Sequence, residues 1–185
     1  LKPFPDHSFP AIPSFMYAGN LGLDRHKALL EVGEALQHIS PSFFIDVYGY
    51  AKPEVQEELK KGYGVRYHGR VSYEEVLKQM EQSDFLFHVE SFSDYYTKDL
   101  VTAFSTKISD CLASGRVFIL YAPGSIACAQ YIKENDCGCL VTQYEDLEGK
   151  IKELISNAEL RKMYIDNALR VVVKNHTSEN NSRKL

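Results

Sequence analysis

Short apolar runs alternate with amphipathic stretches along most of the chain. Strand-length runs are expected at 14–18, 43–48, 65–68, 84–89, 117–121 and 138–142. Between and after them, apolar residues at helical spacing predict helices at 26–38, 53–60, 72–82 and 106–114, one ending near 135, and two more at 145–156 and 158–174. This rhythm predicts an α/β fold: a doubly wound, parallel, six-stranded Rossmann-like sheet with helices on both faces.

Local signals fix several of the predicted boundaries. Ser72 precedes Glu75 by three residues, a capping-box pattern that starts a helix. Gly115 follows an amphipathic stretch and is expected to end that helix. The segment from Glu90 to Phe104 is polar and irregular, and we expect a long loop there.

The length of 185 residues fits a single domain. Four prolines crowd the first thirteen residues, so 1–13 is expected to be an interdomain linker remnant. The α/β domain is expected to span 14–175. Residues 176–185 are polar and are expected to form a loosely held tail.

Charge and hydropathy count against nucleic-acid binding and against a membrane-spanning segment. The chain has 21 basic and 25 acidic residues and no basic block, which gives nucleic-acid binding little support. The longest apolar runs, such as 116–122, are far too short to cross a bilayer. No secretory signal opens the sequence, so we expect a cytoplasmic setting, with contact to the inner face of the membrane only through other parts of the protein.

The four cysteines are expected to be free, small and buried. Cys137 and Cys139 are separated by one residue, so within a strand they would face the same side. Zinc sites usually space paired cysteines more widely, and no second pair follows.

In doubly wound sheets ligands bind beyond the carboxyl ends of the strands. The helix expected at 106–114 begins there, with Ser105, Thr106 and Lys107 at its start. Free backbone N–H groups, hydroxyls and an ammonium suit a phosphate. Asp110 lies one turn further and suits a ribose diol. The same spacing also fits an ordinary capped helix with a surface Lys–Asp pair, and spacing alone does not choose.

Several stretches resemble the donor-binding half of retaining GT-B-fold glycosyltransferases, especially those that build capsular and cell-surface polysaccharides. The similarity runs in order from about Phe15 to Val173. The stretches that carry it are FMYAGNLGLDRHKALLEVGEAL, VRYHGRVSYEEVLKQMEQSDFLFHVES, STKISDCLASGRVFILYAPGS and IKENDCGCLV.

This resemblance implies roles for the matching residues. Asp110 takes the place of the second acid of the family's Glu-(seven residues)-Glu motif, which binds the ribose, and Ser105, Thr106 and Lys107 would lie near the diphosphate. Gly19 and Asn20 would form the glycine loop, where a small residue lets backbone approach phosphate. Arg25 is the candidate for the cationic clamp that follows the glycine loop, and the backbone of Val71 would contact the nucleobase. Tyr73 would either stack near the base or have an ordinary packing role within the protein.

The sequence departs from the family pattern at two places. Thr102 stands where the motif has its first acid, which contacts the donor sugar. Glu90, Asp94 and Asp99 are candidates to supply that contact, and the sequence does not choose among them. A basic residue often found in the glycine loop is also replaced, with Asn20 nearby.

The resemblance implies a donor-binding half that moves a sugar from a nucleotide-diphosphate sugar to a glycan or lipid-linked acceptor with retention, as a hexosyltransferase. An N-terminal acceptor-binding domain would be missing from this chain, which is therefore expected to be inactive alone. No metal or other cofactor is expected, because protein cations can stabilise the leaving diphosphate.

No catalytic residue is identified from the sequence. His68 and His88 fall in strands, where packing or hydrogen bonding is the expected role. Tyr95 and Tyr96 can line a sugar or partner surface or anchor the loop. The alternative functions are a non-catalytic flavodoxin-like nucleotide-binding module and a sugar-nucleotide epimerase fragment.

Overall fold

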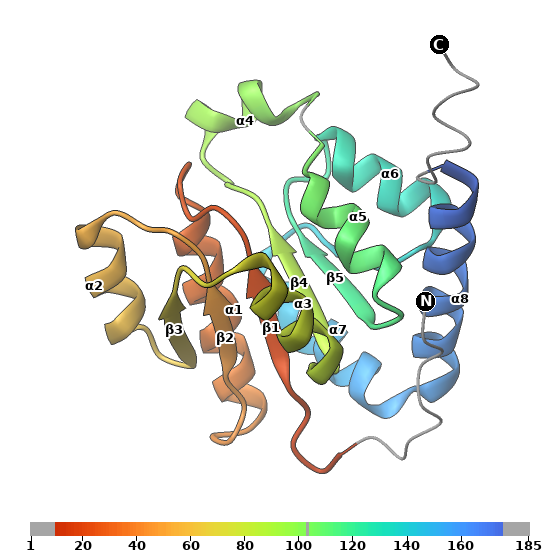
Figure 1. Cartoon of the computed structure of the whole chain (residues 1–185), viewed down its shortest axis with the longest axis horizontal. Helices are drawn as coiled ribbons and strands as arrows, with labels where there is room; N and C mark the ends of the chain where they lie inside the picture. Colours follow the sequence, from red (N-terminus) through yellow and green to blue (C-terminus); the bar gives the residue numbers. More distant parts are fainter. Residues whose placement is uncertain (1–9, 103, 176–185) are drawn as a thin grey trace.

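The computed structural model describes residues 10–102 and 104–175. Strands and helices alternate through these residues (Figure 1). The strands are β1 (Phe15–Ala18), β2 (Ile45–Tyr48), β3 (Val65–Gly69), β4 (Phe85–Val89), β5 (Val117–Tyr121) and β6 (Cys139–Val141). The helices are α1 (Arg25–Ile39), α2 (Pro53–Lys61), α3 (Tyr73–Gln82), α4 (Asp94–Leu100), α5 (Thr106–Ala113), α6 (Ala127–Asn135), α7 (Tyr144–Ser156) and α8 (Ala158–Asn175).

All six strands are parallel, in the order β3-β2-β1-β4-β5-β6. The chain winds outward from β1 through β2 to β3, returns to β4 beside β1, and winds the other way to β6. The predicted doubly wound sheet is therefore confirmed. The order reverses between β1 and β4, and this is where such sheets leave a crevice for a ligand.

Helices cover both faces of the sheet. The central strands β4 and β5 carry apolar side chains on both faces, and both faces therefore have to be shielded from water. One core cluster joins Phe15, Phe85 and Ile119 of the sheet to α1 and α7. The other joins Leu86 and Leu120 to α5, α6 and part of α8. In Figure 1, α3 and α5 lie in front of the sheet and α1 and α7 lie behind it.

The predicted loop over Glu90–Phe104 was wrong in its middle, where residues Asp94–Leu100 form α4. This helix has seven residues, too few for a helical repeat to be visible in the sequence. It is held by burial of Leu100 and by packing of Tyr96 on the second core cluster. Tyr95 packs edge-on against Tyr96, at 4.9 Å between ring centroids, and is 79% exposed. In Figure 1, α4 lies above the carboxyl edge of the sheet.

All four cysteines are free and buried, as the sequence predicts. Cys137 and Cys139 do not share a strand, so the condition for their facing the same side is not met. β6 begins only at Cys139, so Cys137 lies in the preceding turn and packs in the opposite core cluster. Most of the expected linker 1–13, and all of the expected tail 176–185, lies outside the described residues.

Candidate functional site

Two adjoining clefts open at the carboxyl edge of the sheet. The inner cleft, of about 440 Å³, lies between the loop after β1, the end of β4 and the start of α5. The outer cleft, of about 390 Å³, lies between the same loop, the end of β2 and the loop from β3 to α3. Gly19, Asn20 and Lys107 line both clefts. The two clefts therefore form one groove over the point where the strand order reverses.

The loop after β1 needs glycine at its first position. The Gly19 amide donates to the Tyr48 carbonyl at 3.0 Å, which holds the loop against the end of β2. A Cβ atom on Gly19 would lie 2.6 Å from the Tyr17 hydroxyl. That hydroxyl donates to the Asn20 carbonyl at 3.0 Å, and burial raises the pKa of Tyr17, so the donor keeps its proton. The Asn20 side chain accepts from the Gly22 amide at 2.8 Å.

The start of α5 faces the inner cleft. The Ser105 side chain caps the helix by accepting from the Lys107 amide at 3.3 Å. Ser105, Thr106 and Lys107 all line the inner cleft. The positive end of the helix and the Lys107 ammonium therefore point toward a space that suits an anion. At the other end of α5, Gly115 adopts a left-handed φ of 70°, the backbone conformation that commonly terminates a helix.

Arg25 reaches the inner cleft from the first position of α1. Two consecutive residues before it, Leu23 and Asp24, are left-handed, with φ of 58° and 60°. Such strain at residues other than glycine is concentrated at functional sites. Lys27 partly secures the turn through an ion pair with Asp24 at 2.9 Å.

A buried cluster of charged and polar side chains forms the wall of the inner cleft beside β4. The Arg25 Nε group donates to Glu90 Oε2 at 2.7 Å, and the Arg25 Nη2 atom lies 2.7 Å from the same oxygen as an ion pair. The His88 Nε2 atom lies 2.9 Å from Glu90 Oε1. The Glu90 and His88 side chains are 5% and 4% exposed, so this network is almost dry. His88 is hydrogen-bonded, as the sequence predicts for that residue.

Asp110 lies on α5 one turn after Lys107, beside Tyr73 of α3. The Tyr73 hydroxyl donates to Asp110 Oδ1 at 3.4 Å, and the Lys107 Nζ lies 5.7 Å from the centroid of the Tyr73 ring. Partial burial and the nearby Asp110 carboxylate raise the pKa of Tyr73. The phenol therefore remains a hydrogen-bond donor next to an acceptor carboxylate.

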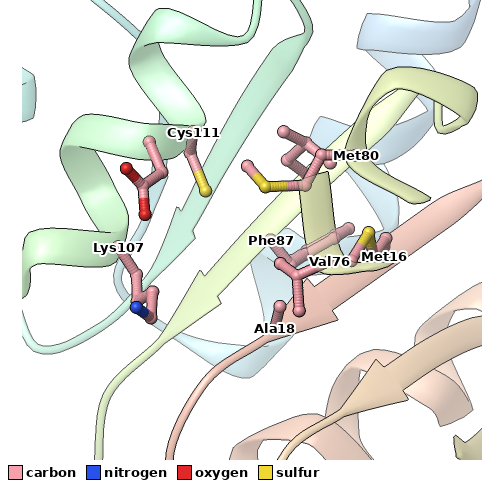
Figure 2. Close-up of a pocket in the computed structure, with 9 residues that line it drawn as sticks. Met16, Ala18, Val76, Met80, Phe87, Lys107 and Cys111 are labelled. Carbon is pink, nitrogen blue, oxygen red and sulfur yellow. The ribbon is translucent and has the colours of Figure 1, made fainter. Parts of the chain in front are cut away.

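A small apolar pocket, which Asp110 helps to line, lies between α3 and α5 (Figure 2). Met16, Met80, Phe87 and Cys111 line it, and Figure 2 shows the two thioethers and the thiol around its space. Burial raises the pKa of Cys111 to about 12, so its thiol is neutral. The pocket holds about 10 Å³, room for roughly one water molecule. It extends the groove without being a ligand site of its own.

The structure brings the candidate residues together at this edge. Asp110 lines the apolar pocket that adjoins the groove. Each of the others lines one or both clefts: Gly19, Asn20, Arg25, Val71, Ser105, Thr106 and Lys107. Their individual ligand contacts stay predictions.

The candidates for the missing first acid differ in position. Glu90 lines the inner cleft, whereas Asp94 is exposed at the start of α4, and the Asp99 side chain lies outside the described part of the chain. Thr102, which stands at the motif position, is exposed and lines neither cleft.

Sequence reasoning missed several residues of the groove. Tyr48, Gly49, Tyr50 and Arg70 line the outer cleft. The Tyr48 ring stacks on His68 at 4.6 Å between centroids. The last three follow β2 or β3 directly, so the rule that ligands bind after strands was the one signal that pointed to them.

The described residues contain no group of three or more histidine, cysteine, aspartate or glutamate side chains able to hold a metal ion. No helix among them has the length and apolar content to span a bilayer.

A protein-family model described as "Glycosyl transferase-like" matches residues 25–185. No curated protein sequence matches the chain significantly.

Several solved structures share the fold. A glycosyltransferase from Rickettsia africae superposes with a TM-score of 0.74 at 18% identity, over 95% of this chain and 46% of that one. HepE from Anabaena, in complex with UDP-glucose, gives 0.72 at 14%, over 93% and 47%. The C-terminal domain of LpcC, a group 1 family glycosyl transferase from Francisella tularensis, gives 0.64 at 17%, over 90% and 89%. The chain thus spans about half the length of the first two and most of the isolated C-terminal domain.

Proposed function

This chain belongs to the glycosyl transferase-like family, and from that premise we propose that it is the donor-binding half of a glycosyltransferase that uses a nucleotide-diphosphate sugar. One observation carries the proposal. The glycine loop, Arg25, Lys107 and the start of α5 line one cleft over the strand-order reversal, where a diphosphate can meet three sources of positive charge.

The groove suggests how the donor lies. The diphosphate occupies the inner cleft, facing Arg25, Lys107 and the free N–H groups of α5. The ribose hydroxyls donate to Asp110, whose position beside Tyr73 suits a diol. The base lies in the outer cleft near the backbone of Val71. HepE, which shares the fold, was solved with UDP-glucose, so UDP is the first nucleotide to test.

The same charges serve the chemical step. As the bond from the sugar to the diphosphate breaks, negative charge grows on the leaving diphosphate and the sugar becomes oxocarbenium-like. Arg25, Lys107 and the dipole of α5 stabilise that charge in place of a divalent metal. We therefore propose a metal-independent transfer, of the hexosyltransferase type, with retention of configuration.

A second domain completes the enzyme in this proposal. Exposed apolar side chains line the clefts at Tyr50, Tyr73 and Phe104, and others lie on the segments that follow β1 and β4: Leu23, Phe92, Tyr95 and Val101. Such a rim suits a surface that closes over the donor and excludes water. The second domain binds a glycan or lipid-linked acceptor, as in enzymes of polysaccharide biosynthesis, and the present chain alone transfers no sugar. Its four buried free cysteines suit a reducing compartment such as the cytoplasm.

Calorimetric titration of the 185-residue chain with UDP, GDP, UMP and FMN tests the proposal. A donor-binding half binds one of the two diphosphates, and binds it more tightly than the corresponding monophosphate. Saturable binding of FMN together with no binding of UDP or GDP would instead identify a flavodoxin-like module.

A further inference from the structure

Glu90 lines the inner cleft and contacts two other side chains that line it, Arg25 and His88. Given the donor-binding function proposed above, we propose that Glu90 is a positioning residue. Its carboxylate fixes the Arg25 guanidinium so that the remaining N–H groups of Arg25 face the donor diphosphate.

The contact geometry is suited to this role. Both the Nε and the Nη2 groups of Arg25 lie 2.7 Å from Glu90 Oε2. A guanidinium is planar and carries five N–H groups on three nitrogens, and this pairing holds the edge formed by Nε and Nη2. Because the group is rigid, holding one edge also sets the direction of the other. The N–H groups on the opposite edge then remain for a ligand in the cleft that Arg25 lines.

Burial makes the pairing persistent. The Glu90 side chain is 5% exposed and the Arg25 side chain 13%. A carboxylate this deeply buried is costly without cationic or hydrogen-bonding partners. Its second oxygen, Oε1, lies 2.9 Å from Nε2 of His88 in β4, so the carboxylate is held from both sides. An Arg25 side chain freed from this anchor would regain rotamer freedom, and a ligand would have to order it again.

Two other roles for Glu90 predict different behaviour. If Glu90 bound hydroxyls of the transferred sugar, as the missing first acid of the family motif would, its removal would weaken binding of UDP-glucose and spare UDP. Both oxygens of Glu90 already have partners, which favours the positioning role. If Glu90 acted only through its charge, removing a negative group from an anion site would strengthen UDP binding. Positioning predicts the opposite sign.

The experiment compares wild type with Glu90→Gln by titration with UDP, UMP and UDP-glucose. Glutamine keeps the size of the side chain but loses its charge. We expect UDP to bind about tenfold more weakly, since a charge-assisted hydrogen bond that presents Arg25 is lost. UMP should change much less, because it lacks the β-phosphate that the proposed donor position brings to Arg25.

A double-mutant cycle with Arg25→Ala isolates the mechanism. Once Arg25 is absent there is nothing for Glu90 to position, so adding Glu90→Gln to Arg25→Ala should cause no further loss of UDP affinity. Glu58→Gln is the matched control: Glu58 also pairs with a histidine, His26, at 3.2 Å, and it lines neither cleft.

Circular dichroism and thermal unfolding check that each variant folds. If Glu90→Gln does not fold, Glu90→Asp keeps the charge and withdraws it by one methylene, with the same expected loss for UDP. Unchanged or tighter UDP binding, or a loss confined to UDP-glucose, overturns the inference while leaving the donor site intact. A wild-type chain that binds neither UDP nor GDP overturns the proposed function itself.

Discussion

Replacing Lys107 by alanine removes one cation from the centre of the proposed donor site. Lys107 lines both clefts, and its Nζ lies 5.7 Å from the Tyr73 ring beside Asp110. It occupies the first turn of α5, where a positive charge opposes the helix dipole and alanine is the better helix former. The substitution should therefore leave the fold intact and act on ligand binding alone.

The expected loss follows from the position of the ammonium. A charge pair about 4 Å apart is worth about 1 kcal/mol in bulk water and about 4 kcal/mol near a protein surface. Lys107 is half-buried in an open groove, so we take an intermediate value of about 2 kcal/mol, which is about thirtyfold in the dissociation constant of UDP. The loss should shrink as salt is raised, because the groove is open to solvent.

Isothermal titration calorimetry with UDP at low and high salt measures this effect. Lys162→Ala is the control, since Lys162 is an exposed residue of α8 that pairs with Asp166 and lines neither cleft. Equal UDP affinity for the Lys107 and Lys162 variants would refute the placement of the diphosphate beside α5.

Four further outcomes are expected. Asp110→Asn should weaken UDP and UMP by the same factor of about ten, because both carry the ribose whose hydroxyls it would bind; calorimetry that shows a loss for UDP alone would contradict this. Gly19→Ala places a Cβ against the Tyr17 hydroxyl and should lower the free energy of unfolding in urea by about 1–3 kcal/mol; an unchanged midpoint would show that the loop yields freely. Burial raises the pKa of the Cys111 and Cys139 thiols to about 12, whereas thiols of an unfolded chain have a pKa of about 8.5. As the pH rises, the unfolded state therefore loses these protons before the folded state does. Urea melts should therefore show the full contribution of these thiols below about pH 8 and a progressive loss above it, and a stability that rises there would contradict the sign. Titration in EDTA should leave the UDP affinity unchanged, and loss of binding would indicate a required metal.

Much of the fold is encoded in local signals. β5 matches its predicted bounds because Gly115 and Pro123 lie on either side of a continuous apolar run. Ser72 caps α3 as its sequence pattern predicts, with the Glu75 amide donating to Ser72 Oγ at 3.1 Å. β2 begins two residues later than expected, at Ile45 in place of Phe43, because an apolar side chain can be buried from a turn as well as from a strand.

The site was predictable in its location but not in its connections. Ligands bind beyond the carboxyl ends of parallel strands, and a helix start is expected there at Thr106 and Lys107. The features that suit an anion at that point, the free backbone N–H groups and the Lys107 ammonium, belong to residues adjacent in sequence, so they could be predicted. The Arg25–Glu90 pair joins residues 65 apart, and no periodicity or spacing relates them. Tertiary packing alone brings the first turn of α1 to the end of β4, and for that reason the sequence left Glu90 as one of three candidate acids.

A crystal structure of this chain with UDP tests the central claim most directly. We expect the diphosphate in the inner cleft between Arg25 and the start of α5, with the ribose hydroxyls donating to Asp110. Density for UDP elsewhere, or an Asp110 carboxylate turned away from the ribose, would contradict the assignment of this groove as a donor site.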